Sequence, residues 1–222
     1  MSEVNVPVYL PLIEKEELYA INKSSADAWF GCGKHVKEFE ELVQNVIGSS
    51  NRYTVAVNTC TSGIHLSLLL CNVGKMHEVI LSSLNFVGVA QAISATGAKP
   101  VFCDIENDSL TIDIEKAEKL INHKTAAIIT LDFGSNQCDL DQFIDLCKKH
   151  NIRLIHDAAH SFGWKNKGRT TGSFGDICFF SFDPVKNFTA IDAGVITLND
   201  PDEEKWIIEA RTVGQSMDMS TY

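Results

Sequence analysis

The sequence predicts an α/β fold in which helices cover both faces of a mainly parallel, seven-stranded sheet, giving three layers. Apolar runs of strand length alternate with segments of helical periodicity, as in strands joined by crossover helices. Polar residues follow several of these runs, where sites form in open α/β sheets. The 222 residues and 45% hydrophobic content suffice for one sizeable core.

An extended arm and two helices are predicted before the first strand. Val6–Leu12 contains two prolines and is expected to be the arm. Glu14–Ala28 has helical spacing and early acidic residues, which favour a helix start. Gly31-Cys32-Gly33 interrupts the pattern, and Val36–Ile47 resumes it. We therefore expect residues 1–50 to form an N-terminal arm with helices.

The seven predicted strands are short apolar runs bounded by turn-forming residues. They are Tyr53–Val57, Glu78–Ser82, Pro100–Asp104, Ala126–Leu131, Arg153–Ile155, Ile177–Phe182 and Gly194–Leu198. Helices are expected over Ile64–Leu70, from Asn85-Phe86-Val87-Gly88 through Ala95, and over Asp113–Ile121, Leu140–His150 and Pro201–Arg211. Residues 51–212 are thus the predicted core domain, and 213–222 a tail without a closing element.

Composition narrows the function classes. The formal net charge of −10 argues against a nucleic-acid-binding surface. Seven cysteines without a C-x-x-C pair, mostly inside apolar runs, indicate reduced thiols and no disulfide framework or metal site. Met1–Tyr9 lacks the features of a signal peptide, and no apolar run approaches the roughly 20 residues of a membrane span. We expect a cytoplasmic protein.

Polar residues gather after two of the last three predicted strands. Asp157 and His160 follow Arg153–Ile155, while Ser181 and Lys186 lie at and beyond the end of Ile177–Phe182. Asp157 could be a helix N-cap, and a single lysine is usually a surface residue. A lysine beside a buried strand end can instead lose its proton and act as a nucleophile. A lysine and an aspartate in one crevice are the pair that pyridoxal 5′-phosphate (PLP) requires.

Two further segments are candidates for cofactor contacts. Asn58–Gly63 is a polar turn that leads into a helix, where free N–H groups and the helix dipole favour an anion. Thr61 and Ser62 would add hydroxyl groups, although a simple capped helix accounts for them equally well. Phe86 follows a strand and is either a core residue or a flat contact for an aromatic ring.

Several motifs in order resemble the sugar-aminotransferase family called DegT/DnrJ/EryC1/StrS, PLP enzymes of fold type I. They are Asp157-Ala158-Ala159-His160, Lys167-Gly168-Arg169, Gly172-Ser173-Phe174-Gly175-Asp176 and Phe180-Ser181-Phe182-Asp183-Pro184-Val185-Lys186-Asn187. The similarity continues upstream over nearly all of the chain. It implies the seven-stranded large domain of that fold.

The resemblance assigns a role to each candidate residue. It implies that Lys186 holds PLP covalently and moves the reacting proton, and that Asp157 keeps the ring nitrogen protonated. The other cofactor contacts that it implies are phosphate binding by Thr61, Ser62 and Ser181, ring stacking by Phe86, and a bond from His160 to the ring hydroxyl. Cys60 stands where the family usually has Gly, and His160 where Gln is more frequent. The segment Trp29–Glu40 is similar to one near the family's substrate entrance.

The resemblance implies a homodimeric aminotransferase of amino-sugar and polysaccharide biosynthesis. It would move an amino group, typically from glutamate, to a keto group of a nucleotide-linked sugar. One alternative is a PLP-dependent sugar dehydratase of the same fold, whose relatives replace the lysine by His, so Lys186 favours the first function. The other is a non-catalytic PLP-binding relative, since Ile191-Asp192-Ala193-Gly194 is poorer in Gly than the family pattern. The family's small carboxyl-terminal domain has no counterpart here, so we expect cofactor binding with poor turnover.

Overall fold

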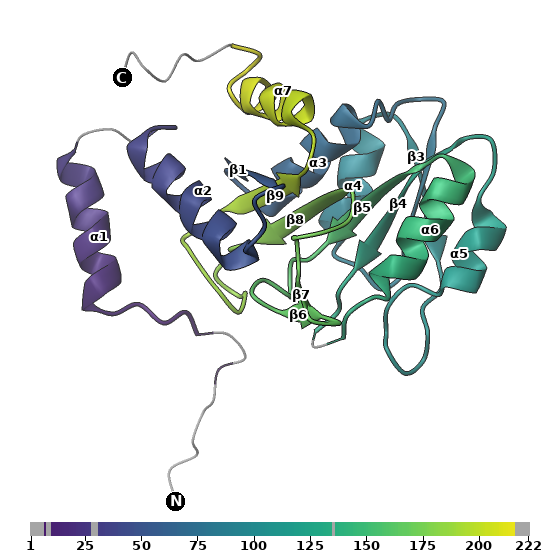
Figure 1. Cartoon of the computed structure of the whole chain (residues 1–222), viewed down its shortest axis with the longest axis horizontal. Helices are drawn as coiled ribbons and strands as arrows, with labels where there is room; N and C mark the ends of the chain where they lie inside the picture. Colours follow the sequence, from purple (N-terminus) through teal and green to yellow (C-terminus); the bar gives the residue numbers. More distant parts are fainter. Residues whose placement is uncertain (1–6, 8–9, 28–30, 135, 216–222) are drawn as a thin grey trace, which may run out of the picture.

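The computed structural model describes residues 7, 10–27, 31–134 and 136–215 and is built around a seven-stranded sheet (Figure 1). The strands are β1 (Tyr53–Val57), β2 (Glu78–Ser82), β3 (Lys99–Cys103), β4 (Thr125–Leu131), β5 (Arg153–Asp157), β8 (Ile177–Ser181) and β9 (Gly194–Leu198). Their order is β1-β9-β8-β5-β4-β2-β3. Only β9 runs antiparallel to its neighbours, β8 and β1, so the predicted mainly parallel sheet is confirmed.

Helices cover both faces of this sheet. The helices of the described chain are α1 (Lys15–Ala26), which lies apart from the sheet, and α2 (Lys34–Ile47), α3 (Cys60–Leu70), α4 (Val87–Ala95), α5 (Ile114–Leu120), α6 (Leu140–His150) and α7 (Pro201–Arg211), which pack on it. The apolar core on one face is shared with α3, α4 and α7, whereas α2, α5 and α6 pack on the other face. Along β2, Val79 and Leu81 enter the first core and Ile80 the second. The three predicted layers are therefore present.

The N-terminal segment lies at the margin of the fold. Figure 1 shows α1 beyond α2, away from the sheet, and none of its side chains is buried. Glu14 caps α1, and Ala28 at the predicted helix end lies outside the described residues. Residues 6, 8 and 9 of the predicted arm are also outside them, while Pro7 and residues 10–12 are neither helix nor strand. No helix in the described part of the chain is both long and apolar enough to cross a bilayer.

The predicted start of α3 at Ile64 is wrong, because the helix begins at Cys60. The Thr59 hydroxyl accepts a hydrogen bond from the Ser62 backbone N–H at 3.1 Å and so caps the helix. Thr61 and Ser62 are therefore part of the first helical turn, not of a preceding loop. This places their side chains directly at the positive end of the helix dipole.

Smaller differences concern strand ends and one hairpin. β5 extends two residues beyond its predicted end and includes Asp157, whereas β8 ends at Ser181 and β3 begins and ends one residue early. A two-stranded hairpin, β6 (Lys165–Asn166) and β7 (Arg169–Thr170), was not predicted. Its turn residues, Lys167 and Gly168, both have positive φ, as two-residue hairpin turns of this type require.

Gly194 allows β9 to pass close to the first turn of α3. A Cβ atom on Gly194 would lie 2.7 Å from the Cys60 backbone nitrogen and 2.8 Å from its Cα atom. Both neighbours are backbone atoms, so they cannot move aside as a flexible side chain does. The start of β9 can therefore pack against the start of α3 only because residue 194 has no side chain.

We predict that Gly194→Ala destabilises the protein by about 1–3 kcal/mol, because the added methyl group overpacks this contact. The measurement is urea unfolding of the variant and the wild type. Gly74→Ala is the matched control, since its nearest neighbour is the Thr96 carbonyl oxygen, 4.0 Å from the added Cβ. Equal stability of the two variants would show that the contact at Gly194 is not tight.

Candidate active site

The carboxyl ends of β5 and β8 bring two of the predicted site residues to one edge of the sheet. Asp157 is the last residue of β5, and Ser181 is the last residue of the adjacent strand β8. Lys186 lies just beyond β8 in a turn whose Lys186 N–H donates to the Asp183 carbonyl at 3.0 Å. The pairing of β5 with β8 therefore brings residues that are far apart in the sequence to the same edge of the sheet.

Asp157 is a buried carboxylate with only 3% of its surface exposed. Its Oδ1 atom accepts a hydrogen bond from the Ala159 N–H at 3.0 Å. No helix follows within residues 158–166, so the helix N-cap alternative for Asp157 is wrong. Burial raises the pKa of Asp157 to about 7, against the opposing effects of the Ala159 N–H and of the His156 and Lys186 charges. A cation placed beside this carboxylate would be bound strongly.

Lys186 is half-buried and acts electrostatically on three groups around it. Burial is the main influence on the pKa of Asp157, His160 and Cys60, and in each case the Lys186 charge lowers the pKa. Its charge is therefore felt by all three side chains. Lys186, Asp157 and His160 thus follow the ends of neighbouring strands and influence one another electrostatically, and their joint role in a site stays a prediction.

His160 is held in one tautomer. Its Nδ1 atom accepts a hydrogen bond from the Gly134 backbone N–H at 3.2 Å, so the neutral ring carries its proton on Nε2. Burial and the Lys186 charge both lower the pKa of His160, which favours this neutral form. The Phe133 ring meets the imidazole edge to face, with centroids 5.9 Å apart. His160 can therefore donate one hydrogen bond from Nε2.

Three predicted phosphate-binding hydroxyls converge at the N-terminus of α3. Thr61 and Ser62 belong to its first turn, and the Ser62 hydroxyl lies 2.8 Å from that of Thr59. Ser181 is the last residue of β8, which packs against α3. Burial raises the pKa of the Cys60 thiol at the start of α3, and Ser181 is among the groups that oppose this shift, so Ser181 lies near the same helix end. Free N–H groups and the dipole make such an end an anion site.

Phe86 lies beside this helix end with its ring largely open. It occupies the N-cap position of α4 and is 67% exposed. A Cβ on Gly88 would meet both the Phe86 ring and the Thr61 hydroxyl, at 2.5 and 3.2 Å, so these two side chains are neighbours. Phe86 is therefore not a core residue, and its exposed ring is free to contact a flat ligand.

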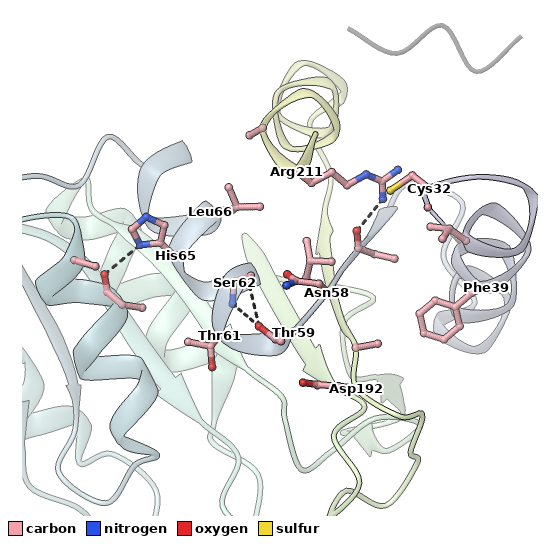
Figure 2. A pocket seen from close by; sticks show the side chains of 18 of the residues that line it. Cys32, Phe39, Asn58, Thr59, Thr61, Ser62, His65, Leu66, Asp192 and Arg211 are labelled. Carbon is pink, nitrogen blue, oxygen red and sulfur yellow. Dashed lines mark hydrogen bonds between the residues drawn. The ribbon is translucent and has the colours of Figure 1, made fainter. Parts of the chain in front are cut away.

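A cavity of about 1010 Å³ opens next to the start of α3 (Figure 2). Asn58, Thr59, Thr61 and Ser62 line it from one side and Arg211 from α7. The cavity is also lined by Gly31, Cys32, Val36 and Phe39, which belong to the segment predicted to lie near a substrate entrance. Trp29 and Phe30 of that segment are outside the described residues. Asp157, His160 and Lys186 do not line it. The cavity therefore borders the N-terminus of α3 and continues toward α2 and α7.

Arg211 fixes the far wall of this cavity. Its Nη1 atom donates to Glu40 Oε1 at 2.5 Å and to the Ala56 carbonyl at 2.8 Å, and the Ala56 N–H donates to the same Glu40 oxygen at 2.8 Å. The arginine side chain is only 9% exposed. This ion pair ties α2 and α7 to β1, so the cavity has a rigid frame.

Three residues near the site have no clear signal in the sequence. Thr59 lies in the segment singled out for anion binding, but its capping role depends on where α3 starts. Asp132 and His156 form a buried ion pair with 3.0 Å between Asp132 Oδ2 and His156 Nε2. Asp132 follows the apolar strand β4, and His156 lies within the apolar strand β5. A single polar residue in such a position does not reveal its partner until the neighbouring strand is known.

Solved structures share this fold over almost the whole chain. The aminotransferase TlmJ from Streptoalloteichus hindustanus has a TM-score of 0.90 and 31% identity, covering 96% of this chain and 58% of its own. The PLP form of the putative sugar aminotransferase Spr1654 from Streptococcus pneumoniae has a TM-score of 0.84 and 29% identity, covering 91% and 56%. The protein thus has the type I fold of PLP-dependent aminotransferases.

The family model of the DegT/DnrJ/EryC1/StrS aminotransferases matches residues 11–222. The spore coat polysaccharide biosynthesis protein SpsC from Bacillus subtilis is 36% identical over 195 residues, 88% of this chain and 50% of that protein. The chain belongs to the DegT/DnrJ/EryC1/StrS aminotransferase family, and the predicted resemblance is confirmed. It spans about half the length of the curated relatives it matches.

The raised pKa of Asp157 predicts a pH effect on the cofactor-free protein. The folded pKa of about 7 exceeds the ordinary value of 3.8, so the folded state holds this proton more tightly than the unfolded state. The corresponding stability is present below pH 4 and is lost as the pH rises to 7. We predict that Asp157→Asn gains stability relative to wild type over this range, by up to about 4 kcal/mol.

Denaturant unfolding at several pH values measures this difference. Asp145→Asn on the exposed surface of α6 is the control for removing one carboxylate. Wild-type and Asp157→Asn stabilities that stay parallel from pH 4 to 8 would contradict the assignment of a raised pKa to Asp157.

Proposed function

We propose that this chain carries the cofactor site of a PLP-dependent aminotransferase that transfers an amino group to a keto group of a nucleotide-linked sugar. The observation that carries the proposal is the buried Asp157 carboxylate beside Lys186, next to a helix N-terminus with three hydroxyl groups. Relatives in the same family include the GDP-perosamine synthase of Escherichia coli O157:H7, 33% identical over 198 residues.

The residues present fit PLP at each of its functional groups. A buried carboxylate with a raised pKa matches a cationic ring nitrogen, and an exposed aromatic ring matches a ring face. The start of α3 matches a phosphate. When bound, PLP supplies a carbonyl carbon that accepts an amino group and a ring that withdraws electrons from the reacting carbon.

Lys186 and Asp157 carry the chemical roles in this proposal. Lys186 would hold the cofactor through its carbonyl carbon, and its amine would move the proton at the reacting carbon. Asp157 holds the proton on the ring nitrogen, because the negative carboxylate stabilises the positive ring. The pairing also relieves the burial penalty that raises the pKa of Asp157 in the free protein.

The remaining residues bind and orient. His160 donates from Nε2 to the ring hydroxyl oxygen, since Gly134 occupies its Nδ1 atom. Thr61, Ser62 and Ser181 bind the phosphate together with the free N–H groups of α3. Phe86 covers one ring face. The cavity bordered by Arg211 and Asn58 is proposed to receive part of the sugar substrate.

The donor and the reaction type follow from the lysine. We propose glutamate as the typical amino donor, as the family resemblance implies. A sugar dehydratase of the same fold is disfavoured because the position that such relatives fill with His is Lys186 here. Amino-sugar formation for a polysaccharide is the corresponding biosynthetic role, and SpsC of Bacillus subtilis is named for polysaccharide biosynthesis.

We also propose a homodimer in the cytoplasm. Apolar side chains are exposed on α1 and α2, including Tyr19 and Leu42, and a second copy would cover them. Buried free thiols such as Cys103 and Cys178 are usual in a reducing compartment. We further propose that residues 1–50 form the N-terminal arm with helices, residues 51–212 the PLP-binding large domain and residues 213–222 a tail.

The experiment is covalent trapping at Lys186. The protein is saturated with PLP, reduced with borohydride and mapped by peptide mass spectrometry. We predict that the label is on Lys186, because this lysine alone shares the crevice with Asp157 among the residues assigned to the site. Lys186→Arg should carry no label, and Lys165→Arg, on the exposed hairpin strand β6, should be labelled like the wild type. Label on another lysine would refute the assignment.

A further inference from the structure

A second group of polar side chains lies on the opposite face of the sheet from Asp157. In the β4–β5–β8 register, His156 pairs with Thr130 on one side and Cys178 on the other. All three are buried, and the Thr130 hydroxyl has no hydrogen-bond partner in the described chain. Since consecutive strand residues point to opposite faces, His156 lies directly behind Asp157.

The centre of this group is the ion pair between Asp132 and His156. Their side chains are 1% and 6% exposed, and Asp132 Oδ2 lies 3.0 Å from His156 Nε2. Neither imidazole nitrogen has a well-aligned hydrogen bond within the described residues, so the contact is mainly electrostatic. Burial, which lowers the pKa of His156, is outweighed by the Asp132 charge, and the pKa of His156 is raised well above its ordinary value. The pKa of Asp132 is lowered in turn, despite its burial, by the His156 charge, so each partner favours the charged form of the other.

Asp132 also holds the turn that contains the proposed cofactor ligands. Its backbone N–H donates to the Asp157 carbonyl at 3.0 Å. Its Oδ2 atom accepts from the Ser161 hydroxyl at 2.6 Å, and its Oδ1 atom from the Cys138 N–H at 3.0 Å. The Ser161 N–H donates in turn to the Ala158 carbonyl at 3.1 Å. The turn from 157 to 161 is thus fixed at both ends by one residue.

Stability alone does not account for this arrangement. Taking two charges out of water costs several kcal/mol per ion, and apolar replacements of a buried pair are often equally stable or more so. Perturbed ionisable groups that are buried together cluster at functional sites. His156 is the residue before Asp157, and the Asp132 backbone N–H donates to the Asp157 carbonyl, so the pair adjoins the carboxylate whose ionisation the proposed reaction needs.

The charges around Asp157 define what the pair can do. The titratable groups that interact electrostatically with Asp157 are His156, Lys186, Asp132 and Cys60. The His156 and Lys186 charges favour the carboxylate, and the Asp132 charge disfavours it. His156 itself faces Asp132 and Cys178. The imidazolium is thus a fixed positive charge behind Asp157 that stays in place when Lys186 reacts.

We propose that Asp132 and His156 are positioning residues for Asp157 and His160: the pair anchors the 157–161 turn and its imidazolium holds Asp157 as a carboxylate. This inference rests on the proposed function for its role in catalysis. The state of Asp157 in the cofactor-free protein does not depend on that function and can be measured alone.

The test is the titration of Asp157 by carbon-detected NMR in the cofactor-free protein, with the signal assigned from Asp157→Asn. In His156→Gln we expect the titration midpoint of Asp157 to rise by about one pH unit or more, because a positive charge is lost. The double variant Asp132→Asn with His156→Gln removes both charges and should fold even if the single variant does not. Its Asp157 midpoint should also rise, though less, since the opposing Asp132 charge is lost as well.

Ser161→Ala separates anchoring from charge. It should speed hydrogen exchange of the Ala159 amide while moving the Asp157 midpoint less than His156→Gln does. Equilibrium binding of PLP to His156→Gln should be weaker at pH 7 and recover above the shifted midpoint. An unchanged Asp157 midpoint in both charge variants would overturn the proposal. Failure of the wild type to bind PLP would refute the proposed function and leave the NMR result standing.

Discussion

The burial of the Asp157 carboxylate at the end of β5 is the constraint on which the rest of the site depends. A carboxylate with 3% exposure needs compensation, and the structure supplies it from several directions. The Ala159 N–H bonds to it, and the His156 and Lys186 charges favour its ionised form. The pKa of about 7 shows that this compensation is incomplete. A bound cation would complete the compensation. The cost of burying the Asp157 carboxylate, which destabilises the cofactor-free site, therefore favours a protonated ring nitrogen when a cofactor is bound.

The start of α3 is the second part of the site whose position the fold constrains, in addition to Asp157. Thr59 caps the helix, and Gly194 lets β9 approach the Cys60 backbone. Strand β8, which ends at Ser181, also packs against α3. Because β8 packs against α3 and also pairs with β5, the N-terminus of α3 and the Asp157 carboxylate are held at a fixed spacing. A rigid ligand with a phosphate and a basic ring nitrogen can satisfy both.

Sequence patterns predicted most of the fold because most elements bury a continuous apolar face. Tyr53–Val57, Leu140–His150 and Pro201–Arg211 have the predicted bounds. The start of α3 was missed because Cys60-Thr61-Ser62 is polar and resembles a loop until Thr59 is recognised as a cap. The β6–β7 hairpin was missed because strands of two residues have no periodicity.

The site was predictable where it follows strand ends and not where it depends on strand order. Lys186, Asp157 and His160 come after apolar runs, so their convergence could be expected. The local amino-acid composition predicts neither the antiparallel direction of β9 nor the pairing of β4 with β5. For this reason Asp132 and His156, which are far apart in the chain, gave no sign of forming a pair. Their contact exists only through the register of neighbouring strands.

The measurement that most directly tests the central claim is a half-reaction with glutamate. The PLP-loaded protein is mixed with glutamate and its absorption spectrum is followed as the cofactor takes up the amino group. The account predicts conversion of the bound PLP to pyridoxamine phosphate in the wild type, slow as it is expected to be, and none in Lys186→Ala. A spectrum unchanged by glutamate, or conversion in Lys186→Ala at the wild-type rate, would contradict it.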